Sequence, residues 1–187
     1  MKKGIKALGM NMEDINGNDM IYEMNKEYVH DGDIRCRYSG YHYFDSIRDV
    51  MYLYNLNKSR IFECELNGDV FDHDSIVHCT NKIKLIREIS KEEITKYIED
   101  NLEKLINDER WCVRREVARH GYGLDILIND EDWRVRLEVA IHGYGLDILI
   151  NDKDCDVRAE VARQGYGLDK LINDAHWYVR DEVARRI

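Results

Sequence analysis

The second half of the chain repeats itself with a period of 22 residues. The phrase Gly-Tyr-Gly-Leu-Asp-x-Leu-Ile-Asn-Asp begins at Gly121, Gly143 and Gly165. A second phrase, x-x-Val-Arg-x-Glu-Val-Ala, alternates with these copies and begins at Trp111, Trp133, Cys155 and Trp177. A fixed period of this size is typical of a stacked array, in which each unit buries its apolar face only against its neighbours. We therefore expect an all-α solenoid here.

The unit that begins near residue 130 shows how each unit divides. Asp130 and Asp132 offer helix N-caps, and apolar residues at helical spacing predict a helix near 132–142. Gly143 is expected to end that helix, because glycine enters the left-handed conformation without steric cost. Residues 144–150 predict a short second helix or 3₁₀ turn.

The boundary of the array is predicted near residue 90. Ser90 and Glu93 match a capping box, and the apolar residues that follow predict a capping helix over 91–106. We therefore expect a domain at 1–90 and a solenoid at 91–187. The array would hold the capping helix and four units that start near residues 108, 130, 152 and 174, the last one partial.

Residues 1–90 predict a small α+β domain. Enrichment in β-branched and aromatic residues predicts strands at Lys2–Leu8, Met20–His30, Arg60–Leu66, Ile76–Cys79 and Ile83–Ile89. The spacing of apolar residues over 46–54 predicts an amphipathic helix. Asn-Gly at 16–17, Asp-Gly at 31–32 and Asn-Gly at 67–68 are turn signals.

Charge and composition exclude several classes of function. The net charge is −9, and both halves are acidic, so generic binding to nucleic-acid phosphates is disfavoured. A basic stripe on one face is the alternative. No apolar run approaches the roughly 18–20 residues that span a bilayer, and the amino terminus lacks the apolar stretch of a signal peptide. Five scattered cysteines without a Cys-x-x-Cys pair fit a reduced compartment, so we expect a cytoplasmic protein.

Two charged residues recur in every unit. Arginine stands at 114, 136, 158 and 180, and aspartate stands six residues earlier at 108, 130, 152 and 174. One interpretation is an arginine stripe for an anionic partner. The other is an internal Asp–Arg ladder between neighbouring units, which strict recurrence favours.

The second half resembles known helical arrays. The recurrent Asp-x-x-x-x-x-Arg followed by Val-Ala resembles the first helix of HEAT-type repeats, and the short period resembles the leucine-rich repeat variant family. The resemblance covers residues 102–187 and implies macromolecular binding without catalysis. The candidate binding residues are Trp111, Arg115, Trp133, Arg134, His142 and Trp177, since Trp and Arg are favoured interface anchors. Packing between units is the alternative role for the tryptophans.

The first half carries a different resemblance. Gly-Tyr-His-Tyr-Phe at 40–44, the segment 60–74 and the segment 80–90 resemble an uncharacterised domain of phage and Firmicutes proteins. The same order also resembles small rifamycin-type ADP-ribosyltransferases. That likeness places His42 at the family's stacking tyrosine and Asp72, His73 or Asp74 near its acidic catalytic position. The family's first-strand histidine has no counterpart in residues 4–8, and the alternative is that His42 is a partly buried strand residue.

No complete catalytic or metal-ligand set is visible in the sequence. His73, His78 and Cys79 lack a second ligand pair, so no metal is expected. We therefore expect a non-enzymatic protein of phage or mobile-element type, without a cofactor, that binds a protein partner such as a host defence complex. The alternative is a divergent ADP-ribosyltransferase that uses NAD, with the repeats recruiting its target. The sequence leaves the oligomeric state open.

Overall fold

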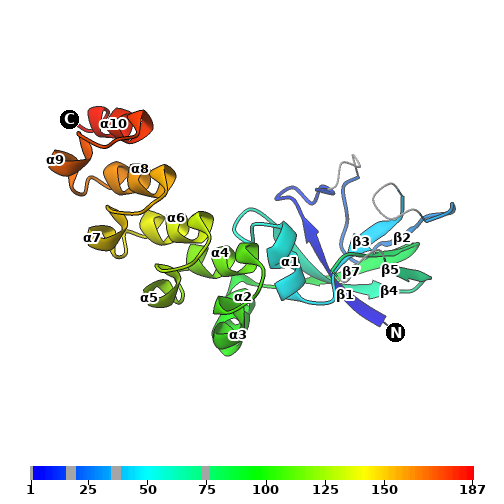
Figure 1. The fold of residues 1–187 in the computed structure, drawn as a ribbon. Helices are drawn as coiled ribbons and strands as arrows, with labels where there is room; N and C mark the ends of the chain where they lie inside the picture. The colour runs from blue at the N-terminus through cyan, green and yellow to red at the C-terminus, as the bar shows by residue number, and fades with distance from the viewer. Residues whose placement is uncertain (1, 16–19, 35–38, 73–75) are drawn as a thin grey trace. The chain divides into compact units, whose positions relative to one another are not determined.

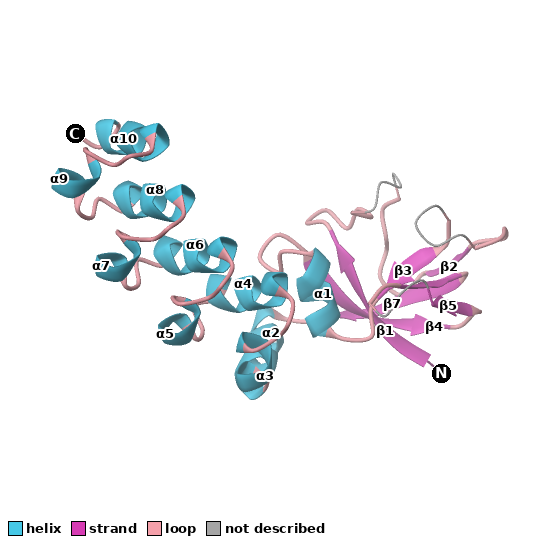
Figure 2. Ribbon diagram, viewed as in Figure 1, coloured by secondary structure: helices cyan, strands magenta, loops and turns pink. Residues whose placement is uncertain are grey.

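The computed structural model describes residues 2–15, 20–34, 39–72 and 76–187. The chain forms two compact units, Met1–Asp100 and Asn101–Ile187 (Figure 1). The first unit holds the described strands, and the second is helical (Figure 2).

Two antiparallel sheets form the framework of the first unit. The four-stranded sheet has the order β1 (Lys2–Leu8), β4 (Arg60–Leu66), β7 (Lys82–Glu88) and β2 (Glu27–Val29). The three-stranded sheet has the order β3 (Tyr41–Tyr43), β6 (His78–Thr80) and β5 (Val70–Asp72). Helices α1 (Ile47–Leu53) and α2 (Lys91–Asp100) complete the unit.

The core of the first unit is built from alternating strand residues. β1 and β4 pair along their full length, from Lys2 opposite Leu66 to Leu8 opposite Arg60. Successive side chains of a strand point to opposite faces, so one face of each strand supplies apolar groups to the core. The buried cluster consists of Leu8, Tyr22, Tyr41, Tyr43, Phe62, Cys64, Leu66, Ile83 and Leu85.

Side-chain caps determine where both helices of this unit begin. The Ser46 hydroxyl accepts the backbone N–H of Asp49 at 3.2 Å at the start of α1. Before α2, Glu93 N–H donates to Ser90 Oγ at 3.2 Å, and Ser90 N–H donates to Glu93 Oε2 at 2.9 Å. The predicted capping box is therefore confirmed.

Several sequence-based expectations for these elements are wrong. Of the strand expected over Met20–His30, only Glu27–Val29 forms a regular strand, because Asn25 takes a left-handed backbone with φ of 62°. The helix expected over 91–106 is divided at Asn101 into α2 and α3 (Leu102–Ile106), and α2 belongs to the first unit. Strand β5 was not expected. The Asn-Gly turn at 16–17 lies outside the described residues.

Long and short helices alternate in the second unit. The long helices are α4 (Trp111–Arg119), α6 (Trp133–Ile141), α8 (Cys155–Arg163) and α10 (Trp177–Ala184). The short helices are α5 (Leu124–Leu127), α7 (Leu146–Leu149) and α9 (Leu168–Leu171). Each long helix packs on the next, and the valines of the Val-Arg and Glu-Val-Ala phrases are fully buried between them.

Glycines end the long helices and begin the short ones. After α6, Gly143 N–H donates to Ala140 O at 2.8 Å and Tyr144 N–H donates to Val139 O at 3.3 Å, with Gly143 at φ of 70°. This is the Schellman arrangement expected for a glycine at this position. Gly145 then caps α7 at φ of 59° and lies directly against Ile128.

None of the described helices combines the length and the apolar composition that crossing a bilayer requires.

Candidate functional site

Three of the four recurrent arginines of the second unit, Arg114, Arg136 and Arg158, form an internal ladder with recurrent aspartates. Arg114 donates to Asp130 from Nε at 2.6 Å and from Nη2 at 2.9 Å, and Nη1 donates to the carbonyl of Asp108 at 2.7 Å. Arg136–Asp152 and Arg158–Asp174 repeat the bidentate pair, with Nε–Oδ2 distances of 2.6 and 2.7 Å. Because these guanidinium groups are engaged within the unit, they do not form a binding stripe.

The ladder fixes the charge state of its members. The hydrogen bond to Asp130 raises the pKa of Arg114, and the hydrogen bond from Arg158 lowers the pKa of Asp174. Glu131, whose side chain is largely exposed, adds a further contact to Arg114 at 3.3 Å from Nη2. Ionised partners and a fork-shaped geometry make these hydrogen bonds strong ones.

A second network joins the long helices through buried glutamates. Glu116, Glu138, Glu160 and Glu182 are each at most 8% exposed. Arg119 bridges the first two of these carboxylates, and Arg163 bridges the last two. Ile141 occupies the bridging position between the two pairs. Arg163 holds the pKa of Glu182 below its usual range.

Four of the six predicted binding residues lie together in one stack. The guanidinium carbon of Arg115 lies 4.9 Å from the centre of the Trp111 ring. Arg134 lies 4.4 Å from Trp111 and 5.1 Å from Trp133. The order Arg115–Trp111–Arg134–Trp133 therefore alternates cation and ring between α4 and α6. We call this set the Arg–Trp stack.

The Arg–Trp stack holds the guanidinium groups, which are hydrogen-bond donors, against rigid aromatic rings. Arg134 also donates to Asp132 at 3.0 Å, which fixes its orientation, and 41% of its side chain is exposed. Arg115 Nε is buried without a hydrogen-bond partner among the described atoms. Cation–π contacts of this kind hold long side chains in place. The stack is therefore suited to accept a carboxylate beside an apolar surface.

The other two predicted binding residues lie apart from the stack. His142 follows α6, and its Nε2 lies 3.0 Å from the carbonyl of Arg119. Trp177 begins α10, is 64% exposed and stacks on His176 with ring centres 6.0 Å apart. Cys155 occupies the corresponding position of α8, so the tryptophan series is interrupted between Trp133 and Trp177.

The first unit does not present His42 as an open stacking surface. His42 lies in β3 opposite Cys79 and is 8% exposed. Its carbonyl accepts a hydrogen bond from Lys6 Nζ at 3.1 Å. The backbone of Asp72 ends β5, opposite His78. The other two residues of the expected acidic site, His73 and Asp74, lie outside the described residues.

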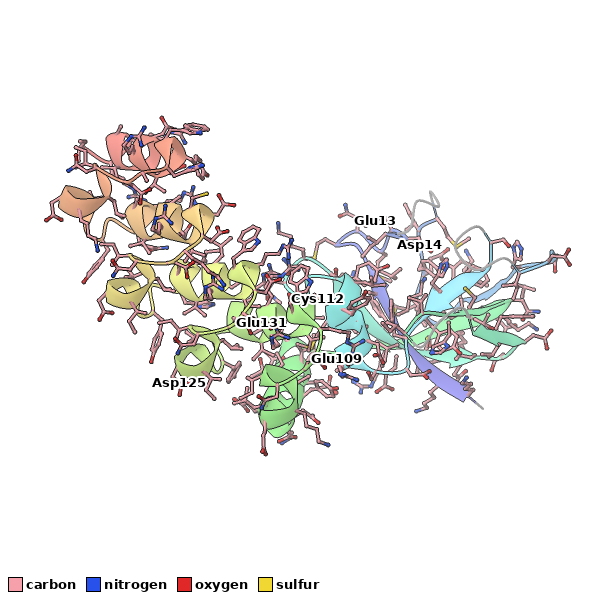
Figure 3. All side chains as sticks on the ribbon, viewed as in Figure 1. Glu13, Asp14, Glu109, Cys112, Asp125 and Glu131 are labelled. Atoms are coloured by element: carbon pink, nitrogen blue, oxygen red, sulfur yellow. The ribbon has the colours of Figure 1, made fainter. Side chains whose placement is uncertain are left out.

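A buried ionic cluster in the first unit was missed by sequence reasoning. Lys6 is 1% exposed, and its Nζ lies 3.5 Å from Asp14 Oδ2 and 4.9 Å from the centre of the Tyr22 ring. Burial lowers the pKa of Lys6 and raises that of Cys64 to about 12. Asp14 is labelled in Figure 3. The sequence pattern could have indicated this burial, because Lys6 lies two residues before the apolar Leu8 and therefore on the same face of the strand.

One group of side chains in the described part of the chain has the spacing of metal ligands. Asp154, Cys155 and Asp156 place ligand atoms within 4.8 Å of one another. Asp154 already accepts the N–H of Asp156 at 2.9 Å as the N-cap of α8. Desolvation raises the pKa of the Cys155 thiol, which opposes the thiolate that a metal requires. We therefore interpret the group as a helix cap.

Comparison with known proteins identifies a family for the first part of the chain. The family model described as "Domain of unknown function (DUF7666)" matches residues 2–97. Neither the curated proteins nor the solved structures contain a match.

Proposed function

We propose that this protein has a non-enzymatic role and binds a protein partner through its helical unit. The chain belongs to the family of the domain of unknown function DUF7666. The observation that carries the proposal is the Arg–Trp stack on α4 and α6. Trp and Arg are the residues that most often dominate the energetics of protein interfaces. Here both types are brought together at one place on the surface.

The stack lowers the entropic cost of binding. Long side chains lose roughly 0.5–1.5 kcal/mol each when an interface immobilises them. Arg134 is already held between two indole rings and by Asp132. A partner carboxylate would therefore meet a guanidinium that needs little further ordering.

We infer that the helical unit is a short α-solenoid of the HEAT-like or leucine-rich repeat variant type. The sequence period of 22 residues, the alternation of long and short helices and the recurrence of the Asp–Arg pair support this inference. Such arrays bind macromolecules on extended surfaces. The resemblance of the first half to phage and Firmicutes proteins makes a host complex, such as a defence complex, the first partner to seek.

The test is quantitative capture of a partner from host cells with the full chain. We expect the double variant Trp111→Ala, Arg134→Ala to lose the partner that the wild type retains in stoichiometric amount. Trp177→Ala is the matched control, because it removes the same type of side chain from α10. Circular dichroism would verify that all variants remain folded. Equal retention by the stack variant and the wild type would contradict the proposal.

The alternative function is NAD-dependent transfer of ADP-ribose to a target recruited by the helical unit. The burial of His42 opposes the alternative, because a stacking residue must be reachable by the nicotinamide ring. Labelled NAD added to the chain and a host lysate separates the two functions. Label transfer that is lost on His42→Ala would replace the binding proposal with this one.

A further inference from the structure

An open groove of about 520 Å³ lies in the helical unit, between residues 106–109, Arg114 and residues 126–131. Its apolar lining comes from Ile106, Ile126 and Leu127. Leu127 is buried, whereas Ile126 is 52% exposed. Apolar surface of this kind accommodates the methylene stem of a long charged side chain. We call this site the acidic groove, because of the charges that line it.

The acidic groove carries more negative charge than its own cations neutralise. It is lined by the carboxylates of Asp108, Glu109, Asp130 and Glu131 and by one guanidinium, that of Arg114. Asp130 is engaged by Arg114, and Asp108 contacts Arg110 at 3.2 Å. Glu131 also contacts Arg114, but 86% of its side chain is exposed. Glu109 is exposed and forms no ion pair in the described part of the chain. The uncompensated charge therefore resides on Glu109 and Glu131, both labelled in Figure 3.

A neutral acceptor lies beside these carboxylates. The Nδ2 atom of Asn107 donates to the carbonyl of Glu103 at 2.8 Å, so the amide nitrogen is engaged within the chain. Its Oδ1 atom remains as an acceptor, and no described donor occupies it. An ammonium group has three donors and no acceptor. The set of one amide oxygen and two carboxylates is therefore suited to an ammonium group.

The repeat itself contains an example of this recognition. Asn151 stands two periods after Asn107, and Lys170 stands two periods after Ile126. The Nζ atom of Lys170 donates to Asn151 Oδ1 across neighbouring units. A lysine thus reaches the equivalent acceptor from the position that Ile126 occupies at the acidic groove. The geometry of the array allows an ammonium group at this place.

The charges at the two places are complementary. Glu109 and Glu131 line the acidic groove, where the chain supplies isoleucine and no lysine. Two periods later, where the chain supplies Lys170, the corresponding positions are Lys153 and Ala175. The acidic residues therefore occur where the ammonium group has to come from another molecule.

We propose that the acidic groove binds a lysine side chain of a partner protein. The stem lies against Ile126 and Leu127, and the ammonium donates to Asn107 Oδ1 and pairs with Glu109 and Glu131. Exposed ion pairs are individually weak, so the groove selects for lysine more than it adds affinity. The acidic groove shares no residue with the Arg–Trp stack, and the proposal does not depend on that site.

The first test titrates the peptide acetyl-Ala-Lys-Ala-amide into the full chain, labelled with ¹³C at isoleucine methyl groups. We expect saturable shifts at Ile106 and Ile126. Binding should weaken about three- to tenfold when norleucine replaces lysine in the peptide, or in the variant Glu109→Gln, Glu131→Gln. It should also weaken at high salt, because exposed ion pairs are screened. Asp147→Asn, Asp169→Asn is the matched control, since it removes two exposed carboxylates outside the groove and should bind normally.

A second test supplies the lysine from within the chain, which covers a peptide affinity too low to measure. In Ile126→Lys, the new ammonium should pair with the acidic groove, so adding Glu109→Gln should lower the Tm more than it does in the wild type. Ile148→Lys is the matched control, and its Tm should change with Glu109→Gln only as the wild type does. Circular dichroism verifies that each variant is folded.

A lysine-dependent and Glu109-dependent effect in either test supports the proposal. Equal binding of the lysine and norleucine peptides, with no added effect of Glu109→Gln in Ile126→Lys, overturns it. Self-association of the wild type that is lost in Glu109→Gln, Glu131→Gln would also overturn it, in favour of a second copy of the chain. The variants of the Arg–Trp stack should leave both measurements unchanged, so the two proposals fail independently.

Discussion

Arg114 and Asp130 form two parallel hydrogen bonds, at 2.6 and 2.9 Å, between α4 and the turn before α6. Only 8% and 5% of their side chains are exposed. Because both charges are desolvated, removing Arg114 leaves the Asp130 carboxylate buried without its cation, and removing Asp130 leaves Arg114 with only the exposed Glu131 as an acidic partner. The same pair recurs at Arg136–Asp152 and Arg158–Asp174. The ladder therefore couples the stability of each helix to that of the next.

Replacing one carboxylate of the ladder should destabilise the chain strongly. In Asp152→Ala, Arg136 stays buried without its carboxylate, and we expect a loss of about 3–5 kcal/mol in the free energy of unfolding. Urea unfolding followed by circular dichroism measures it. Arg180→Ala is the control, because this exposed arginine donates only to the carbonyls of Asp174 and Ala175 and to no carboxylate among the described residues, and it should cost about 1 kcal/mol. Similar losses in both variants would show that the ladder is not a stabilising element.

Substitution by alanine should lower the stability of the chain by different amounts at Gly143 and Gly145, two glycines of one loop. Gly143 has φ of 70° and nothing within 4 Å of an added Cβ, so Gly143→Ala should cost only the left-handed strain of about 1–2 kcal/mol. At Gly145, with φ of 59°, the added Cβ would lie 2.1 Å from Ile128 Cδ1. Gly145→Ala should add a packing cost of about 1–3 kcal/mol. Comparison of the two Tm values measures the difference, and equal values would mean that Ile128 moves freely.

Local patterns account for what the sequence predicted correctly. The extents of β1 and β4, the Ser90–Glu93 capping box and the glycine that ends α6 depend on neighbouring residues, which the sequence displays directly. The Asp–Arg ladder was also predictable. It requires only that units of 22 residues stack in order, because each pair then joins equivalent positions.

Contacts between non-equivalent positions could not be predicted in the same way. The sequence named the members of the Arg–Trp stack, but Arg115 and Arg134 occupy different positions of their units, so their alternation with Trp111 appears only in three dimensions. The pairing of Lys6 with Asp14 depends on how the segment after β1 folds back. The acidic part of the expected transferase site lies largely outside the described residues.

Acid should weaken the helical unit through Asp174. Its pKa is lowered below the ordinary value of 3.8 in the folded chain, chiefly by the hydrogen bond from Arg158. A depressed folded pKa means that the stabilisation is complete above the unfolded pKa and is lost as pH falls through the folded pKa. Urea unfolding between pH 6 and 3 should therefore show a decline in stability below about pH 4. Asp174→Asn should be less stable at pH 6 and should decline less. Parallel profiles for the two proteins would contradict this assignment.

We expect Lys6 to contribute to the free energy of unfolding mainly because its ammonium group pairs with the buried Asp14 carboxylate. Lys6→Met leaves the Asp14 carboxylate, 2% exposed, without its cation, and we expect a loss of about 3–5 kcal/mol in the free energy of unfolding. The double variant Lys6→Met, Asp14→Leu should recover much of that loss, since apolar replacement of a buried ion pair is often neutral. Urea unfolding of both variants measures this recovery. A double variant no more stable than Lys6→Met would show that Asp14 serves chiefly Tyr22, whose hydroxyl donates to it at 3.3 Å.

Alkaline pH provides an independent measurement on the same pair. Burial lowers the pKa of Lys6 in the folded chain below its ordinary 10.5, so the unfolded chain binds the proton more tightly. By linkage, the contribution of Lys6 to stability rises with pH between the folded pKa and 10.5. The wild type should therefore gain stability relative to Lys6→Met as pH increases toward that value. A stability difference that stays constant with pH would mean that Lys6 keeps its ordinary pKa despite its burial.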